Sequence, residues 1–412
     1  MSDKNIEKFD GSVTSAKGFS AAGVAAGIKY TNRKDMAMIY TSEPAVVAGT
    51  FTSNVVKAAP VKYDMDIVAN SPCVHAVVAN SGIANAATGE LGMNICKESA
   101  MAVADCLSIP ADCVLVGSTG VIGEQLPLDR MKAGIKKLSE SLADTRQAAS
   151  DAETAIMTTD TVPKEIAVRT VIGGKTVTIG GMSKGSGMIH PDMCTMLAYI
   201  CTDCNITKEM LQKAADTDIP DTFNMITVDG DTSTNDTYLI LANGLAENPV
   251  IDCEGDDFDT FLAALHCVNE HLARNMAKDG EGATALFEVK VSGADTKENA
   301  KKLARSVVGS SLCKAAIYGH DSNFGRFLCA LGYAKAPFDP DKVSISYTSR
   351  AGSIKVFENG LKCDYSEEEA TRILSEDEIT VDIFMNAGSE AATAWGCDLS
   401  YDYVKINADY RS

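Results

Sequence analysis

The strongest constraint on how this chain folds is a run near its middle, KGSGMIHPDMCTML, from Lys184 to Leu197. Two glycines and a proline in this run are typical of an irregular, exposed turn. The apolar residues 196–200 (MLAYI) come directly after it and have the composition of a buried strand. The sequence therefore predicts a loop that delivers Thr195 to the mouth of a core strand.

A threonine in that position suits one particular chemistry. If the Thr195 hydroxyl attacks the carbonyl of Cys194, the peptide becomes an ester, and water then splits the chain. Thr195 is left with a free α-amine, whose reference pKa of about 8 lets it act as a base for the adjacent hydroxyl. Its β-branch also restricts χ1 and so presets the hydroxyl direction. The plain alternative is a Gly-rich loop entering a core strand, and this stretch alone favours that alternative.

Two phosphate-binding motifs fail on inspection. The Gly185-x-Gly187 pair would need a third glycine where His190 stands. The Gly-Lys-Thr run at 174–176 would need an upstream glycine where Arg169 stands. Neither dinucleotide nor nucleoside triphosphate binding is expected.

The composition is that of a soluble globular protein. The 412 residues are 45% hydrophobic and 23% charged, enough for two or three domains with a large core. The net charge of −19 argues against non-specific binding to nucleic acid or to an anionic membrane. Residues 1–5 show no signal peptide, and no apolar run is long enough to cross a bilayer. We expect a cytoplasmic protein.

The cysteines and acidic residues do not predict a metal site. Thirteen scattered cysteines in such a protein are expected to be reduced thiols, most of them in the core. The only C-x-x-C pair is Cys201 with Cys204, and five histidines offer no zinc-finger spacing. The acidic run 229–236 lacks the spacing and the closing Glu of an EF-hand. We expect neither a metal nor a cofactor.

Local patterns predict an alternation of strands and helices. Strands are expected at 36–40, 46–51, 74–79, 114–116, 166–168, 175–179, 196–200, 224–228, 343–347 and 353–357. Helices are expected at 97–107, 128–145, 208–215 and 258–272. From about Ala285 the pattern predicts a separate α/β lobe. It has a turn at Asn359-Gly360, a helix capped by Ser366 and an ordered tail at 405–412.

Several stretches together resemble one family. They are 18–29 (GFSAAGVAAGIK), the glycine loop 117–123, the polar patch 157–161, the run 184–197, the loop 279–284 and the segment 395–407 (WGCDLSYDYVKIN). In that order they resemble the ornithine acetyltransferases, the bifunctional glutamate N-acetyltransferases of arginine biosynthesis. The match runs from about Gly11 to the last residue.

The resemblance implies an α/β sandwich like that of the N-terminal-nucleophile hydrolases, with a smaller C-terminal α/β domain. It also implies self-cleavage between Cys194 and Thr195. Residues 1–194 would then form the α chain, 195–284 would complete the sandwich at the start of the β chain, and 285–412 would form the C-terminal domain. The α and β chains would stay together, as an α2β2 assembly in most members.

The family's reaction is a ping-pong transfer through acetyl-Thr195, from N-acetylornithine to glutamate. Some members also use acetyl-CoA as donor, and the sequence leaves this open. Thr119 and Gly120 match the family's oxyanion hole. The substrate-contact positions correspond to Thr158, Lys184, Thr195, Glu281, Asn407 and Ser412. Lys184 suits a carboxylate and Glu281 suits an amine.

The chain departs from the family pattern at four positions. Cys194 stands where alanine is commonest, and its thiol is a potential competing nucleophile. His190 is also unusual. Ser412 replaces a threonine but keeps the hydroxyl, and Ile83 replaces an asparagine in an Asn-Ser-Gly-Asn loop.

Two other functions stay open. A self-processing aminopeptidase or amidase would use the same nucleophile but pass the acyl group to water. A thiol-rich binding or redox protein would instead centre on Cys201 and Cys204.

Overall fold

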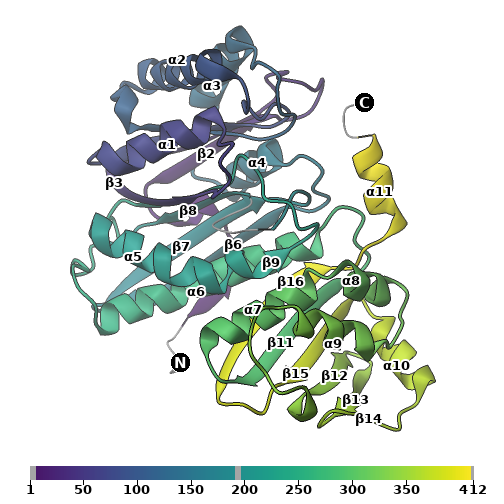
Figure 1. Ribbon diagram of the computed structural model, residues 1–412. Coiled ribbons are helices and arrows are strands. Elements are labelled where there is room, and N and C mark those ends of the chain that lie inside the picture. The colour runs from purple at the N-terminus through teal and green to yellow at the C-terminus, as the bar shows by residue number, and fades with distance from the viewer. Residues whose placement is uncertain (1–5, 191–195, 410–412) are drawn as a thin grey trace. The chain divides into compact units, whose positions relative to one another are not determined.

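A computed structural model of the chain describes residues 6–190 and 196–409 (Figure 1). The chain forms two compact units, which we call unit 1 and unit 2. Unit 1 comprises Met1–Gly185, Asp192–Phe223 and Thr232–Leu272. Unit 2 comprises Ser186–Pro191, Asn224–Asp231 and Ala273–Ser412.

Unit 1 is built on a nine-stranded sheet within its described residues, in the order β1-β6-β7-β8-β10-β3-β4-β5, with β2 paired to β3. The strands are β1 (Glu7–Phe9), β2 (Phe19–Val24), β3 (Met36–Phe51), β4 (Val74–Asn80), β5 (Val114–Ser118), β6 (Lys164–Ile172), β7 (Lys175–Lys184), β8 (Leu197–Thr202) and β10 (Thr237–Ala242).

The long strand β3 joins the two halves of this sheet. Its second half pairs with β10, whereas its first half pairs with β2 and β4, with a register shift between Tyr40 and Ala45. The two strands expected at 36–40 and 46–51 are therefore one strand. Because β3 serves both halves, the sheet folds over and encloses a core that contains Ile39, Leu115, Tyr199 and Leu239.

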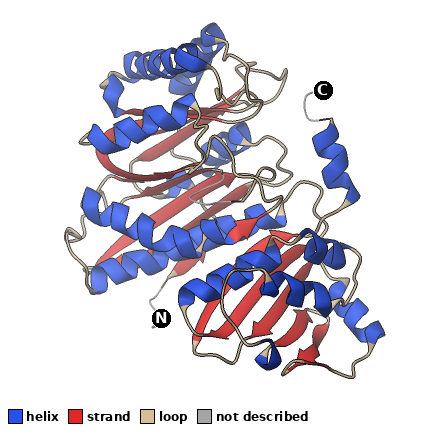
Figure 2. Ribbon diagram, in the orientation of Figure 1, coloured by secondary structure: helices blue, strands red, loops and turns tan. Residues whose placement is uncertain are grey.

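Helices cover the outer faces of the folded sheet (Figure 2). They are α2 (Gly89–Leu107), α3 (Leu128–Ser141), α5 (Lys208–Asp218) and α6 (Asp256–Lys278), which continues into unit 2. Two further helices, α1 (Ala59–Asn70) and α4 (Arg146–Ile156), contribute residues such as Ile67, Ala152 and Ile156 to the inner core that the sheet encloses. Helices α2 and α3 pack on the outer face of β4 and β5 through buried residues that include Cys96, Val103 and Met131. Leu272 of α6 lies against β7 at Gly181. The layers are helix, sheet, sheet and helix.

The helix expected at 128–145 is too long. Helix α3 ends at Ser141, and Thr145 instead caps the next helix by accepting a hydrogen bond from the backbone N–H of Ala148. This second helix, α4, was not expected from the sequence. Its buried face consists mainly of alanines, which pack closely on β2 but give only a weak hydrophobic pattern.

Unit 2 holds a second sheet, in the order β14-β13-β12-β15-β11-β16-β9. Its strands are β9 (Ile226–Thr227), β11 (Leu286–Ala294), β12 (Ser344–Ser349), β13 (Gly352–Glu358), β14 (Leu361–Lys362), β15 (Glu378–Phe384) and β16 (Glu390–Cys397). Its helices are α7 (Lys297–Val308), α8 (Ser311–Tyr318), α9 (Phe324–Gly332), α10 (Glu367–Leu374) and α11 (Tyr401–Ala408).

One local prediction for unit 2 needs correction. The expected strand 224–228 is only β9, because a 3₁₀ turn occupies Phe223–Met225. The turn expected at Asn359-Gly360 is confirmed and lies between β13 and the short β14, while Arg350-Ala351 closes the hairpin of β12 and β13. The tail contains the helix α11. The cap at Ser366 is confirmed, since its hydroxyl accepts the backbone N–H of Glu369 at 3.2 Å.

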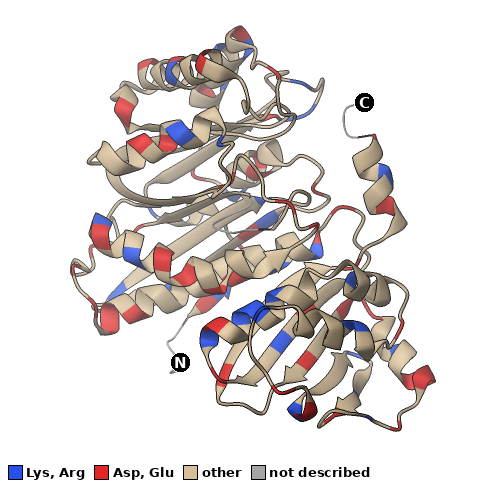
Figure 3. Ribbon diagram, viewed as in Figure 1, with Lys and Arg blue, Asp and Glu red and all other residues tan. Residues whose placement is uncertain are grey.

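The expected fold class, an α/β sandwich with a second α/β lobe, is confirmed. Among the described residues, no helix has the length and hydropathy needed to span a bilayer. Acidic and basic residues both occur on the helices of each unit (Figure 3). The division into 1–194, 195–284 and 285–412 depends on the expected cleavage and stays a prediction.

Candidate active site

The loop that carries Thr119 and Gly120 leaves the end of β5 and is fixed by a neighbouring loop. The backbone N–H of Thr119 donates to Asn80, and the N–H of Val121 donates to Gly82. Gly120 has φ of +124°, and a Cβ there would lie 2.3 Å from the Gly82 carbonyl carbon. Only glycine fits this position, so its backbone N–H is held in a set place.

Ile83 belongs to the same pair of loops. Its backbone bridges to Thr119 and to Val121, while its side chain is 5% exposed and packs in the core beneath α2 and α3. The isoleucine that departs from the family pattern is thus an apolar packing residue, and the loop geometry rests on its backbone.

Lys184 reaches the Thr119 side chain. It is the last residue of β7 and is 8% exposed, and its Nζ donates to Thr119 Oγ1 at 3.3 Å. Because Lys184 donates to this oxygen, the proton of the Thr119 hydroxyl stays available as a donor to another group. Lys184 also pairs in register with Leu197, the first residue of β8.

A buried carboxylate, Asp160, organises the surroundings of Lys184. One oxygen accepts the Gly185 N–H at 2.7 Å and pairs with Lys164 Nζ at 2.8 Å. The other accepts the Thr158 N–H at 3.0 Å. Burial raises the pKa of Asp160, but Lys184 and Lys164 outweigh it, and the net pKa lies below its usual value.

Asp160 therefore connects two predicted contact positions, Thr158 and Lys184, and the sequence did not single it out. The polar patch 157–161 was one of the stretches that carry the family resemblance. The resemblance named Thr158 in this patch but not Asp160.

In unit 2, Glu281 and Asn407 form a direct contact. The Asn407 amide donates to Glu281 Oε2 at 2.7 Å, and the Glu281 side chain is largely buried. The backbone N–H of Glu281 donates to the Ser186 carbonyl at 2.8 Å. A Cβ at Gly187 would lie 2.4 Å from the Glu281 carboxyl carbon, so this glycine makes room for the carboxylate.

The run 184–197 is described only up to His190 and again from Met196. Thr195, Cys194 and Ser412 lie outside the described residues. The described β8 starts at Leu197 and lies between β7 and β10, where the Thr237 N–H donates to the Met196 carbonyl at 2.7 Å.

Within residues 6–190 and 196–409, the pair Cys201 and Cys204 does not form a reactive centre. Cys201 and Cys204 are fully buried, and burial raises the pKa of each thiol, which suppresses the nucleophilic thiolate. Every cysteine in the described residues is free, and these residues contain no group of three or more potential metal ligands. This geometry argues against the redox alternative.

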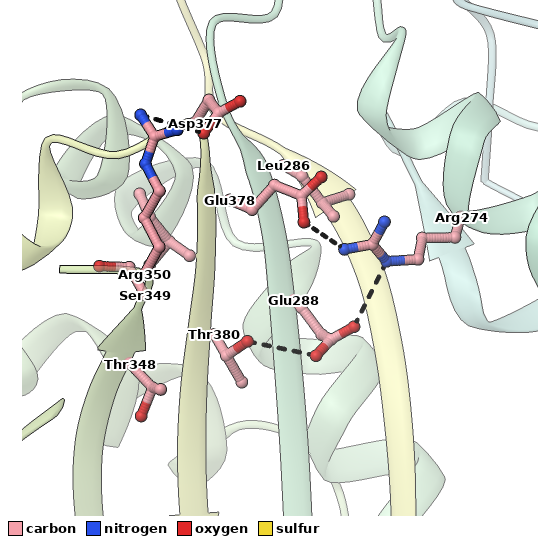
Figure 4. Close-up of a pocket in the computed structure, with 10 residues that line it drawn as sticks. Arg274, Leu286, Glu288, Thr348, Ser349, Arg350, Asp377, Glu378 and Thr380 are labelled. Carbon is pink, nitrogen blue, oxygen red and sulfur yellow. Dashed lines mark hydrogen bonds and ion pairs between the residues drawn. The ribbon is translucent and has the colours of Figure 1, made fainter. Parts of the chain in front are cut away.

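A separate pocket of about 430 Å³ lies in unit 2. Figure 4 shows that its charged side chains point toward one another. Arg274 pairs with Glu378 at 2.7 Å and with Glu288 at 3.8 Å, and Arg350 pairs with Asp377 at 3.8 Å. A ligand here would have to displace these ion pairs. We therefore regard the charged side chains as a stabilising network of ion pairs and not as a binding site.

The chain is similar to proteins of known family over nearly its whole length. A family model described as the ArgJ family matches residues 20–412. A relative from Caldanaerobacter subterraneus subsp. tengcongensis, named arginine biosynthesis bifunctional protein ArgJ, is 49% identical over 407 residues, which are 99% of this chain and 100% of that protein. One from Clostridium acetobutylicum, named arginine biosynthesis bifunctional protein ArgJ 1, is 48% identical over 404 residues, 97% of each.

A solved structure of the arginine biosynthesis bifunctional protein ArgJ from Bacillus halodurans is also similar. It has 45% identity and a TM-score of 0.45, and it covers 46% of this chain and 99% of that chain.

Proposed function

This chain belongs to the ArgJ family, and on that basis we propose that it is a self-processing acetyltransferase of arginine biosynthesis. It moves acetyl from N-acetylornithine to glutamate through an ester on Thr195. The relatives are named bifunctional arginine biosynthesis proteins, which supports this reaction class. The observation that carries the proposal is the contact of Lys184 with Thr119, next to the strand that Thr195 precedes.

Cleavage prepares the nucleophile. The Thr195 hydroxyl adds to the carbonyl carbon of Cys194, the C–N bond breaks, and the proton passes to the amide nitrogen. Water then hydrolyses the ester, which leaves a carboxylate on Cys194 and returns the hydroxyl to Thr195. The new α-amine acts as the base for that hydroxyl.

The acetyl group is then transferred in two steps. The Thr195 oxygen attacks the acetyl carbonyl of N-acetylornithine, and ornithine leaves with the proton. Glutamate then attacks the acetyl ester through its amine and regenerates the hydroxyl. The Thr119 hydroxyl and the Gly120 N–H are the donors for the negative oxygen in each step, and one such donor contributes about 3 kcal/mol to lowering the barrier. The Lys184 contact supports this role, because it leaves the Thr119 proton free to donate.

The charged residues fit amino-acid substrates. Lys184 offers a cation for a carboxylate, and Glu281 offers a carboxylate for an amine. The Asn407 hydrogen bond supports the second role, since it sets the direction of one Glu281 oxygen. Thr158 and Ser412 complete the proposed substrate contacts. No cofactor is required by these steps.

The sheet order supports lasting association of the two fragments. Strands β8 and β10, which follow Thr195, lie between β7 and β3, which precede it. Separation would expose edges on both fragments. We propose that the α and β chains stay paired in a cytoplasmic α2β2 assembly.

The test is incubation of purified protein with N-acetylornithine, with and without glutamate. Ornithine release that requires glutamate and yields N-acetylglutamate supports transfer. Glutamate-independent release with free acetate identifies the aminopeptidase or amidase alternative instead. A parallel assay with acetyl-CoA and glutamate determines whether acetyl-CoA is also a donor.

A further inference from the structure

Hydrogen bonds within unit 2 fix the backbone of the segment that leads toward the proposed cleavage site. We call residues 186–190 the pre-cleavage segment. Ser186 and Ile189 in this segment are fully buried, while Met188 is 42% exposed and has a φ of +53°. This left-handed backbone is unfavourable for methionine, so neighbouring groups must hold it.

Asp229 provides two of these holding contacts. Its Oδ2 accepts the Met188 N–H at 2.6 Å, and its Oδ1 accepts the Ile189 N–H at 3.0 Å. The same Oδ1 accepts the Asp231 N–H at 3.2 Å. Burial raises the pKa of the neighbouring Tyr403 hydroxyl, and the charge of the Asp229 carboxylate raises it further. All of these donors belong to unit 2.

Residues next to Asp229 hold the opposite side of the segment. The Ile189 carbonyl accepts the Val228 N–H at 2.7 Å and the Thr227 hydroxyl at 3.1 Å. Thr227 also contacts His190 Nδ1 at 3.0 Å. Because β9 pairs with β16, these groups belong to a sheet rather than to a free loop.

We propose that Asp229 is a positioning residue for self-cleavage, fixing the direction in which the chain leaves Ile189 toward the bond between Cys194 and Thr195. This inference rests on the proposed self-cleavage. Asp229 takes no part in the bond changes. It acts by limiting the orientations available to the residues before the scissile bond, and intramolecular attack depends steeply on such alignment.

Asp229→Asn is the sharpest probe. The amide nitrogen that it introduces cannot accept a hydrogen bond, so one of the two segment N–H groups loses its partner. Loss of one hydrogen bond to a charged group corresponds to a roughly tenfold to hundredfold slower step. Asp231→Asn is the matched control, because it makes the same charge change at an exposed side chain in the same loop.

The experiment follows full-length chains made by cell-free synthesis, with a pulse label and a chase on denaturing gels. The wild-type chain, Asp231→Asn, Asp229→Asn and Thr195→Ala are compared. We expect the first two to be cleaved at similar rates, Asp229→Asn to be cleaved at least about tenfold more slowly, and Thr195→Ala to stay intact. Cleavage of Asp229→Asn at the wild-type rate overturns this inference and leaves the proposed function standing. Cleavage of Thr195→Ala overturns the proposed function itself.

A second measurement separates positioning from general stability. In the uncleaved Thr195→Ala background, Asp229→Asn should lower the midpoint of thermal unfolding, because a native hydrogen bond is lost, but the midpoint should stay well above the temperature of the cleavage assay. A midpoint at or below the assay temperature would assign the slower cleavage to unfolding and overturn the positioning role. If the Asp229→Asn chain does not fold, Tyr403→Phe decides the matter. Slower cleavage supports the proposal, and an unchanged rate contradicts it.

Discussion

The Asn407 amide on α11 lies 2.7 Å from a carboxylate oxygen of Glu281, although 126 positions separate the two residues in the sequence. The contact joins a helix near the C-terminus to the loop before β11. A second hydrogen bond joins the same two segments, because the hydroxyl of Ser400, at the start of α11, donates to the Gly282 carbonyl at 2.6 Å. The conformation of this carboxylate therefore depends on the last helix of the chain.

Asn407→Ala should weaken substrate binding more than it slows chemistry. Without the amide, Glu281 loses the hydrogen bond to its Oε2, and the carboxylate that we propose binds the amine is less well oriented. We expect KM for N-acetylornithine to rise about tenfold, with a smaller change in kcat, in steady-state assays. The control is Val404→Ala on the same helix, at a side chain that is 65% exposed. Equal KM values for the two variants would contradict the role of Asn407.

Gly187→Ala should displace the Glu281 carboxylate. The new methyl group would lie within 2.5 Å of the Glu281 carboxyl atoms, so Glu281 must move. We expect kcat/KM for transfer to fall by about tenfold or more. Gly332→Ala is the matched control, since a Cβ there meets nothing within 4 Å. Normal transfer by Gly187→Ala would show that the position of Glu281 is not critical.

Thr119→Ala should remove one donor to the negative oxygen. We expect kcat to fall by about 10²–10³-fold while KM changes little, as measured with N-acetylornithine and saturating glutamate. Thr119→Ser keeps the hydroxyl and should retain most of the activity. If alanine and serine behaved alike, the hydroxyl would have no part in the reaction.

These predictions depend on contacts that the sequence indicates only in part. The strand–loop–strand pattern around Lys184 predicted β7 and β8, because this signal is local, whereas Thr158 in the patch 157–161 was indicated only by the family resemblance. The contacts of Asp229 were missed, since its partners are backbone N–H groups some 40 positions earlier and leave no mark on side-chain type. The alanine-rich α4 was missed because burial of small side chains carries little periodic signal.

Glu153 should make stability depend on pH. It is buried in unit 1, and burial raises its pKa to about 8, from 4.5, although the Lys164 N–H and charge oppose this. The folded state therefore keeps a proton that the unfolded state releases, so the free energy of unfolding should fall as pH rises from about 4.5 to about 8. The total effect is on the order of a few kcal/mol.

Glu153→Gln tests this relationship. In urea denaturation of the uncleaved Thr195→Ala chain, the glutamine variant should gain stability relative to its parent near pH 9 and show a flatter pH profile. Glu140→Gln, at an exposed position on α3, is the control. A profile for Glu153→Gln that runs parallel to its parent would mean that Glu153 does not hold the extra proton.

The most direct test of the account is the intact mass of the purified protein, before and after brief exposure to N-acetylornithine. We predict two fragments, one ending at Cys194 and one beginning at Thr195, with a single acetyl group added to Thr195 of the second. One unbroken chain with full activity, or acetyl on another side chain, would contradict the central claim.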